Sequence, residues 1–306
     1  MLKYIAKRLV YCVLVLIGVS IIAFLLLSLA PGSPARLILG DDATDEAVLA
    51  YEKELGLDQP LYIQYYRFII GVFKGDLGNS IYYKRPVTDL IAERLPATAQ
   101  LALGAVVVAL IISLPLGLIS AIKRGTFYDF TAMTFALLGQ SISNVWLGLM
   151  MILLFAVTLG WLPTMGYGTL KHLIMPAIAM GVQSAASQTR LLRSSMVDVL
   201  QEDYITATYA RGLSKTQVIG KYALRNGILP YITAFGTNIA HLLGGAIVSE
   251  QIFNWPGLGV LTNSAINMRD FPLIRAILLT TSAIFVIVML IVDIIYTLVD
   301  PRLDFN

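Results

Sequence analysis

Polar side chains recur inside segments of the sequence that are otherwise strongly apolar. A polar side chain within a membrane is costly, and it usually faces the interior of a helix bundle or water. Uncharged amides and hydroxyls suit a solute that presents hydrogen-bond donors and acceptors rather than one fixed charge, such as a peptide backbone. The candidates for lining a translocation pathway are Gln140, Ser141, Ser143, Asn144, Gln183, Ser184, Ser187, Gln188, Asn238 and His241.

These polar side chains also have a structural explanation. Ser, Asn and Gln form hydrogen bonds between neighbouring membrane helices, so for any single residue both interpretations stay open. His241 has a third option, because an imidazole titrates near neutral pH and binds metals. A lone histidine without a second ligand is more often a packing residue, and we predict no metal site.

Catalytic motifs are missing from the sequence. It contains no G-x-x-x-x-G-K-[ST] phosphate-binding loop, no G-x-S-x-G nucleophile elbow and no H-E-x-x-H pair. The single cysteine, Cys12, rules out a disulfide within the chain and a Cys-based metal site. We therefore expect no catalytic residue and no cofactor bound by this chain.

Six segments can position these polar groups within a membrane. The chain is 57% hydrophobic with a mean hydropathy of +0.76, and about 20 apolar residues are enough for a helix to cross the hydrocarbon core. Runs this long favour helices over the ten-residue strands of a barrel. We predict an all-α, polytopic membrane protein with six transmembrane helices, at about 9–30, 101–122, 133–157, 173–188, 228–248 and 276–299. The first is expected to be a retained signal anchor, since it is longer than a signal-peptide core.

The orientation follows from the Lys and Arg residues near the ends of the segments. Basic clusters precede the first segment, follow the second and fill the region between the fourth and fifth, which places all of them on one side if there are six spans. Both termini are then cytoplasmic. Segment 31–98 carries seven basic and ten acidic residues and is expected to be an external cap of two or three short helices. The predicted organisation is 1–30, 31–98 and a five-helix core over 99–306.

A charged run stands between the fourth and fifth segments, "EDYITATYARGLSKTQVIGKYALRNGILP". We expect a helix from about Ser195 to a left-handed Gly212, followed by a second helix that opens with a capping box between Ser214 and Gln217. This hairpin, at about 195–226, returns to the membrane at Pro230. Two interpretations are open: it lies on anionic lipid as an amphipathic connector, or it docks onto another protein.

The charged run resembles the signature loop of the permease subunits of bacterial ABC importers, in the peptide, oligopeptide and nickel branch of the binding-protein-dependent transport systems, and is similar to its dipeptide permease B type. Further matches agree in order along the whole chain. They are a basic start with "LAPGSPA", then "LGLDQPLYIQY", "FNWPGLG" and "VDIIYTLVDPRLDF".

The resemblance implies a type I ABC importer permease fold, in which the loop between spans 4 and 5 is a coupling helix that docks in a groove of a separate ATPase. One departure is that the "EAA" positions of the general motif read Thr206, Ala207 and Thr208, so the polar contact made by Glu elsewhere is in doubt. Carried over by position, the ATPase-coupling residues are Tyr204, Ala207, Ala210, Arg211, Gly212 and Leu213.

The function implied is that of a non-catalytic permease subunit that moves di- or oligopeptides across the bacterial cytoplasmic (inner) membrane by alternating access. The implied partners are a second homologous permease, two ABC ATPase subunits that hold ATP and Mg²⁺, an external solute-binding protein and the lipid bilayer, with no nucleic acid. One alternative is the same machine for nickel, a metallophore or glutathione. Another is a proton-coupled secondary transporter, which needs a carboxylate near mid-membrane; Asp293 lies too close to the cytoplasmic end of its segment.

Overall fold

The computed structural model describes residues 2–28, 36, 39, 43–54, 56, 58–244 and 246–299. The regular structure of these residues is helical, and the one strand-like pairing among them is a bridge between Asn79 and Pro86. The all-α prediction is confirmed. The "LAPGSPA" match and the end of the last match, "DPRLDF", lie outside the described residues.

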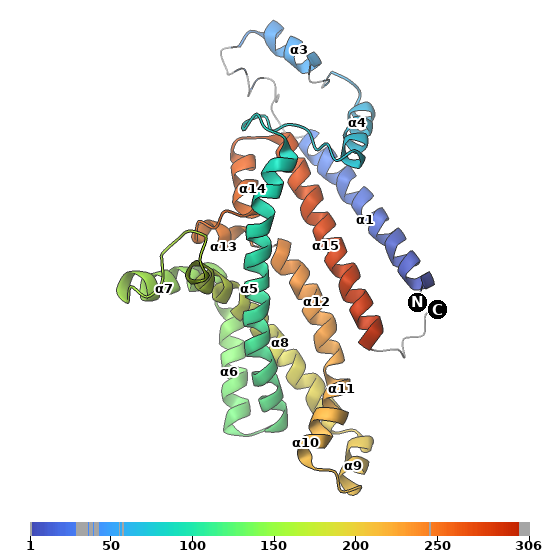
Figure 1. The fold of residues 1–306 in the computed structure, drawn as a ribbon, viewed down its shortest axis with the longest axis vertical. Helices are drawn as coiled ribbons and strands as arrows, with labels where there is room; N and C mark the ends of the chain where they lie inside the picture. The colour runs from blue at the N-terminus through green and yellow to red at the C-terminus, as the bar shows by residue number, and fades with distance from the viewer. Residues whose placement is uncertain are drawn as a thin grey trace.

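The helices form an elongated bundle (Figure 1). Their bounds are α1 (Leu2–Ser28), α3 (Asp45–Glu54), α4 (Leu61–Phe73), α5 (Val87–Ile122), α6 (Phe127–Ser141), α7 (Asn144–Met151), α8 (Leu170–Leu200), α9 (Asp203–Ala210), α10 (Lys215–Gln217), α11 (Leu224–Gly227), α12 (Leu229–Gly244), α13 (Ile247–Ile252), α14 (Leu258–Asn267) and α15 (Phe271–Val299), with π-helical turns η1 (Ile152–Thr158) and η2 (Val218–Ala223).

Three helices of the described chain contain apolar stretches long enough to cross a membrane, over Lys7–Leu25, Val87–Ile122 and Phe271–Ile294. A bent pair, α6 with α7 and η1, is a fourth candidate if it counts as one span. Helices α8 and α12 stand where the fourth and fifth spans are expected. The 16 residues of α12 extend only about 24 Å at 1.5 Å per residue. The count of six spans therefore stays a prediction.

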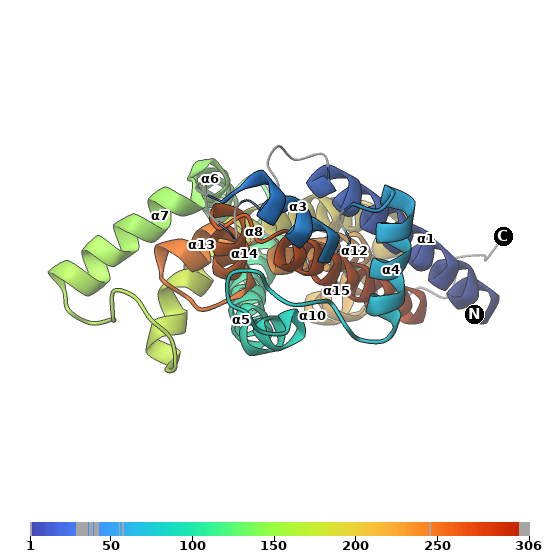
Figure 2. The ribbon, with the colours of Figure 1, turned by 90° about the horizontal axis from the view of Figure 1, so that it is seen from above.

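A single helix over 133–157 is a wrong prediction. The chain bends by 99° between α6 and α7, because Ile142 and Ser143 both have extended backbone, with ψ of 128° and 137°. The Ser143 hydroxyl then accepts a hydrogen bond from the Val145 N–H and caps the start of α7. Seen from above, α7 projects sideways from the bundle (Figure 2).

Helices α5 and α8 lie against each other and form the centre of the bundle (Figure 1). Small residues permit their close approach. A Cβ atom on Gly181 would meet the Ala105 carbonyl oxygen at 2.8 Å, and one on Gly117 would meet the Leu192 side chain at 3.0 Å. This pair is the frame on which the polar residues of α8 are held.

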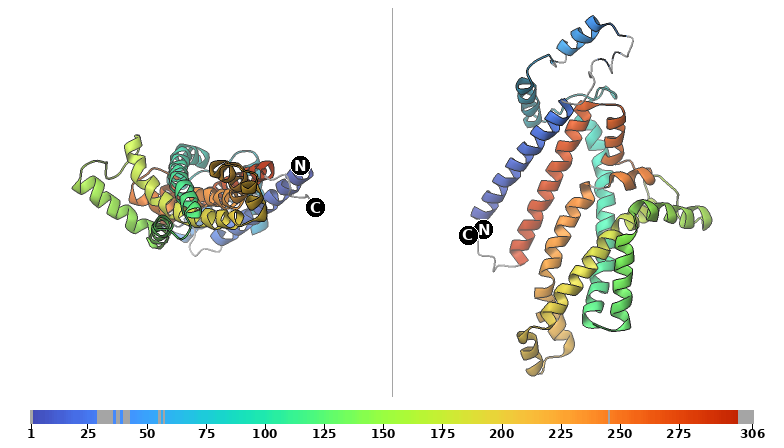
Figure 3. Two further views of the ribbon diagram at one scale, coloured as in Figure 1. Left: turned by 90° about the horizontal axis from the view of Figure 1, so that it is seen from below. Right: turned by 180° about the vertical axis from the view of Figure 1, so that it is seen from behind.

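The charged run forms a helical hairpin at one end of the bundle (Figure 3). Helix α8 continues unbroken to Leu200 and is followed by a turn at Gln201 and Glu202, so the helix predicted from about Ser195 to Gly212 is wrong as one element. Gly212 has a φ of +82°, and Ser214 and Gln217 form the expected capping box. The second helix follows as α10, η2 and α11 without a gap.

The opposite end of the bundle carries α3 and α4, with α14 below them and α13 further toward the middle (Figure 1). Helix α5 already begins at Val87, so the boundary predicted at residue 98 falls inside a helix. The connection between the last two predicted spans contains α13 and α14. Trp255 between them is fully buried and donates a hydrogen bond from Nε1 to the Ala97 carbonyl oxygen at 2.7 Å.

Candidate functional site

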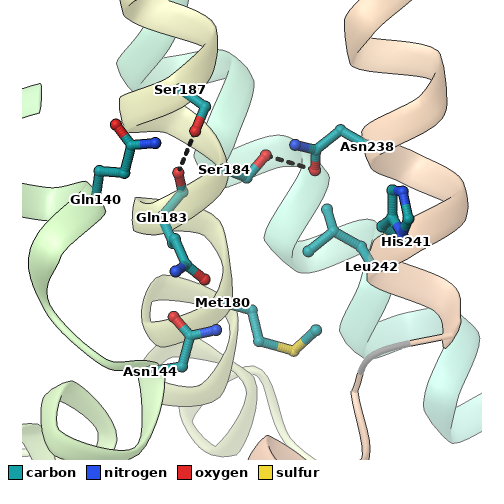
Figure 4. Close-up of a pocket in the computed structure, with 9 residues that line it drawn as sticks. All are labelled: Gln140, Asn144, Met180, Gln183, Ser184, Ser187, Asn238, His241 and Leu242. Carbon is teal, nitrogen blue, oxygen red and sulfur yellow. Dashed lines mark hydrogen bonds between the residues drawn. The ribbon is translucent and has the colours of Figure 1, made fainter.

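A polar cavity of about 460 Å³ opens between α6, α7, α8 and α12. Seven of the ten residues predicted to line a pathway lie around it (Figure 4). None of its lining residues carries a carboxylate, an ammonium or a guanidinium group. The lining residues are Gln140, Asn144, Met180, Gln183, Ser184, Ser187, Asn238, His241 and Leu242.

Helical periodicity explains why residues far apart in the sequence meet here. Residues three or four apart share one face of a helix, which brings Met180, Gln183, Ser184 and Ser187 to one side of α8 and groups the α12 residues in the same way. Gln140 and Asn144 stand on either side of the bend between α6 and α7. The bend, which the sequence analysis missed, therefore places both amides at the cavity.

Hydrogen bonding divides the cavity residues into two groups. Ser184 donates from Oγ to Oδ1 of Asn238 at 2.8 Å, which joins α8 to α12. By contrast, the buried Oδ1 atom of Asn144 has no hydrogen-bond partner within the described chain, and no bond of the Gln183 side chain is found there. The Ser184–Asn238 pair matches the structural explanation of polar residues in helix bundles, whereas the amides of Asn144 and Gln183 keep their hydrogen-bonding capacity.

His241 presents an exposed ring to the cavity. Its ring meets that of Phe285 edge to face, with centroids 6.0 Å apart. The described residues contain no group of three or more His, Cys, Asp and Glu side chains arranged to hold a metal ion. The His241 ring can therefore pack against Phe285 and form hydrogen bonds in the cavity.

Three other polar candidates lie away from the cavity lining. Ser141 donates its hydroxyl to the Leu137 carbonyl oxygen of its own helix at 2.9 Å. Ser143 is the N-cap of α7. Gln188 is 3% exposed, and its Oε1 atom has no partner among the described residues.

The hairpin has one buried and one exposed face. Ile205 and Thr208 of α9 are buried, and Ile205 packs in a core cluster with Val218 and Ala223 of the second helix. The predicted coupling residues are exposed except for the half-buried Leu213. The packed face fixes the hairpin to α8, and the other face is exposed.

A hydrogen bond between side chains joins the two helices of the hairpin. Asn226 donates from Nδ2 to the hydroxyl oxygen of Tyr204 at 2.9 Å. Tyr204 is one of the predicted coupling residues, and the contact ties it to the second helix of the hairpin across 22 positions of sequence.

Comparison with known families and structures identifies the fold and the class of protein. Residues 113–305 match the family described as "Binding-protein-dependent transport system inner membrane component", and residues 1–102 match the corresponding N-terminal family. The chain belongs to the permease family of ABC importers. The permease is 41% identical to the glutathione transport system permease protein GsiC of Escherichia coli K12 and 39% identical to GsiC of Salmonella typhi, each over the full length of both chains.

Solved structures share the fold of the permease at low sequence identity. A chain of the MetNI methionine ABC transporter in an inward-facing conformation gives a TM-score of 0.57 at 16% identity, over 69% of the permease and 96% of that chain. An amino acid ABC transporter with histidines gives 0.53 at 16% identity, over 71% and 95%. These similarities show that the permease has the fold of an ABC importer permease.

Two buried charged groups of the permease were missed by sequence reasoning. Asp129, at the start of α6, receives two hydrogen bonds from Arg193 on α8 and one from the Ser120 hydroxyl on α5 at 2.5 Å. These bonds with Asp129 raise the pKa of Arg193, which stays charged. The sequence signal for this ion pair was Asp129 itself, a single acidic residue close to the basic residues Lys123 and Arg124.

The second missed group is Glu250 of α13, which is fully buried and lies against the start of α14. Its Oε2 atom accepts from the backbone N–H groups of Gly259 and Val260 at 2.7 and 3.2 Å, and its Oε1 atom accepts from the Thr98 hydroxyl at 2.7 Å. A carboxylate in this place satisfies the unpaired donors at a helix N-terminus. The glycines of "FNWPGLG" were the sequence signal for so close an approach.

Proposed function

We propose that this permease moves glutathione, or a short peptide like it, across the bacterial inner membrane along the polar cavity. The observation that carries the proposal is the cavity lining, which combines amides, hydroxyls and one imidazole from α6, α7, α8 and α12. The relatives from E. coli and Salmonella are named as glutathione transport permeases. Within the predicted class of peptide solutes, their names favour glutathione over di- and oligopeptides.

The chemistry of the lining suits a peptide backbone. An amide side chain offers two donors and an acceptor, and a hydroxyl offers both functions. Such groups replace the water lost by the N–H and C=O groups of a peptide, and unpaired polar groups in a desolvated site are costly. Asn144 and Gln183, which have free hydrogen-bonding capacity, are the residues we expect to contact the solute directly.

ATP-driven transport requires the partners implied by the family. We expect a second homologous permease to complete the pathway, two ATPase subunits to hold ATP and Mg²⁺, and an external binding protein to deliver the solute. Closure of the ATPases on ATP would move the hairpin through Tyr204, Ala207, Ala210, Arg211, Gly212 and Leu213. The packed face of α9 supports this role, because a displacement of the hairpin passes into α8 and α12 through a shared core. Both termini are expected on the ATPase side.

Two alternatives have less support. A nickel pathway would favour several nitrogen or sulfur ligands, and the cavity lining holds one histidine. A secondary transporter would need a carboxylate able to exchange protons in mid-membrane. Asp293 forms an ion pair with Arg8, with Oδ2 and Nη1 3.0 Å apart, and family membership argues against this class.

The test starts with the complex isolated from its native membrane in mild detergent. We expect a related permease and two P-loop ATPases to copurify with the chain in fixed ratio. Reconstituted with the binding protein, the complex should take up labelled glutathione in an ATP-dependent manner and should not take up Ni²⁺. Uptake of Ni²⁺ without glutathione, or uptake driven by a proton gradient without ATP, would reject the proposal.

A further inference from the structure

The polar cavity continues toward the hairpin end of the bundle. A second hollow of about 500 Å³ shares Gln140 and Ser187 with the first and extends past Arg190 and Ser194. Along α8 the residues Gln183, Ser187, Arg190 and Ser194 follow one another at spacings of four, three and four, which places them on one face of the helix. The two hollows thus form one polar groove along α8.

The groove contains two guanidinium groups with different surroundings. Arg193 is matched by Asp129, whose two carboxylate oxygens accept from its Nε and Nη2 atoms at 2.6 and 2.7 Å. Arg190 is exposed and donates from Nη1 to the amide oxygen of Gln140, a neutral group. No carboxylate of the described chain pairs with Arg190.

The only charged residues that line the two hollows are therefore basic. None of the residues that line either hollow is acidic, and Arg193 is neutralised. Arg190 remains as a positive charge at the hairpin end of an otherwise uncharged surface, and Gln140 holds its guanidinium toward the groove. A cation that moves along this surface meets no carboxylate, whereas an anion meets a planar guanidinium suited to bidentate carboxylate binding.

We infer that Arg190 binds a carboxylate of the transported peptide and makes this permease selective for anionic peptide solutes. The inference rests on the proposed function, since it assumes that the groove is the pathway. Gln140 is the positioning residue, because its amide oxygen orients the guanidinium. The solute class is a short peptide with at least one carboxylate in excess of its ammonium groups, a class to which glutathione belongs.

The experiment compares two solutes that differ in one charge, glutathione and its glycine carboxamide, in proteoliposomes that hold the complete complex and its binding protein. The quantity of interest is the uptake rate of a variant divided by that of the wild type, taken separately for each solute. The binding protein is the same throughout, so its own preference cancels from this ratio. ATP hydrolysis is measured in the same vesicles.

For Arg190→Gln we expect uptake of glutathione to fall about tenfold, because a charge-assisted hydrogen bond to the solute is lost. Uptake of the carboxamide should fall less than threefold. The matched control is Arg124→Gln, an exposed cation in the turn after α5, which should change neither ratio. An equal loss for both solutes, or no loss for either, would overturn the inference and assign Arg190 to a lipid phosphate or to an acidic residue of a partner subunit.

Arg190→Lys is a second variant, in case the glutamine variant does not assemble. It keeps the charge and loses the planar fork, so glutathione uptake should fall about threefold with little change for the carboxamide. Equal ratios in this variant would also overturn the inference. Failure of the wild type to take up either peptide would reject the proposed function itself, and the inference with it.

Discussion

Arg193 binds Asp129 through two parallel hydrogen bonds, from Nε to Oδ1 at 2.6 Å and from Nη2 to Oδ2 at 2.7 Å. The side chain of Asp129 is 7% exposed and that of Arg193 is 27% exposed. The carboxylate also accepts from the Gly125 N–H at 2.9 Å, so one acidic side chain fastens α8 to the turn between α5 and α6. Asp129 thereby holds the start of α6 against Arg193, which lines the polar groove.

Asp129→Asn should destabilise the permease, because it leaves the guanidinium of Arg193 partly buried without a counter-charge. Breaking a buried pair from one side costs about 3 kcal/mol. We expect a clear fall in the melting temperature of the purified complex. Asp198→Asn, at an exposed acid on the same helix as Arg193, is the control and should leave it unchanged. A melting temperature equal to the wild type would show that the pair contributes nothing to stability.

Gly212→Pro should uncouple ATP hydrolysis from transport. Gly212 has a φ of +82° and donates its N–H to the Tyr209 carbonyl oxygen at 2.9 Å, whereas proline is fixed near −65° and has no N–H. The variant should insert and hydrolyse ATP but take up less than about a tenth of the wild-type amount of solute. Gly212→Asn is the control, since asparagine tolerates left-handed backbone. Normal uptake by the proline variant would remove the coupling role from the hairpin.

Glu250→Ala should cost more stability than Glu250→Gln. The alanine variant leaves the N–H groups of Gly259 and Val260 and the Thr98 hydroxyl without their acceptor in a buried place. Each unsatisfied donor costs about 1–3 kcal/mol. Glutamine keeps one acceptor oxygen, so its melting temperature should lie between those of the alanine variant and the wild type. Equal melting temperatures for the two variants would show that the carboxylate network does not hold α14.

Gly259→Ala tests whether the glycine is needed for this network. An added Cβ would lie 2.5 Å from the Cα of Ile247 and 2.8 Å from Oε2 of Glu250. Both distances are shorter than van der Waals contact, so the backbone of α14 would have to move away from α13. We expect little folded complex in the membrane. Gly18→Ala is the control because no atom lies within 4 Å of its added Cβ, and alanine favours a helix by about 1 kcal/mol over glycine. Normal yield of the Gly259 variant would contradict the close approach.

Local patterns in the sequence predicted the elements that depend on local physics. The apolar runs of α1, α5 and α15, the left-handed Gly212 and the capping box at Ser214 follow from hydropathy, glycine conformation and side-chain capping. The resemblance supplied the family, which the comparisons confirm. These features need no knowledge of which helices are neighbours.

Features that depend on contacts between distant segments were missed. The bend at Ile142 lies in the short polar stretch from Gln140 to Asn144, which was interpreted as pathway lining rather than as the end of one helix and the cap of the next. The burial of Trp255 requires the Ala97 carbonyl oxygen, 158 positions away. Asp129 and Arg193 are 64 positions apart. Seven of the ten candidate pathway residues lie at one cavity, and the others do not because hydropathy does not reveal which way Ser141 or Gln188 points.

Substitutions in the cavity separate residues that support the bundle from residues that contact the solute. Ser184 and Asn238 join α8 to α12 by a hydrogen bond. Ser184→Ala removes the donor to Oδ1 of Asn238, so it should reduce the free energy of unfolding by about 1 kcal/mol and lower the melting temperature. Gln183 is exposed in the cavity, so Gln183→Leu should leave the melting temperature unchanged. Its effect should appear instead as a threefold to tenfold loss of glutathione uptake, roughly one hydrogen bond to the solute. If Gln183→Leu keeps full uptake, this side chain does not contact the solute, and the pathway must be formed by other residues of the permease pair.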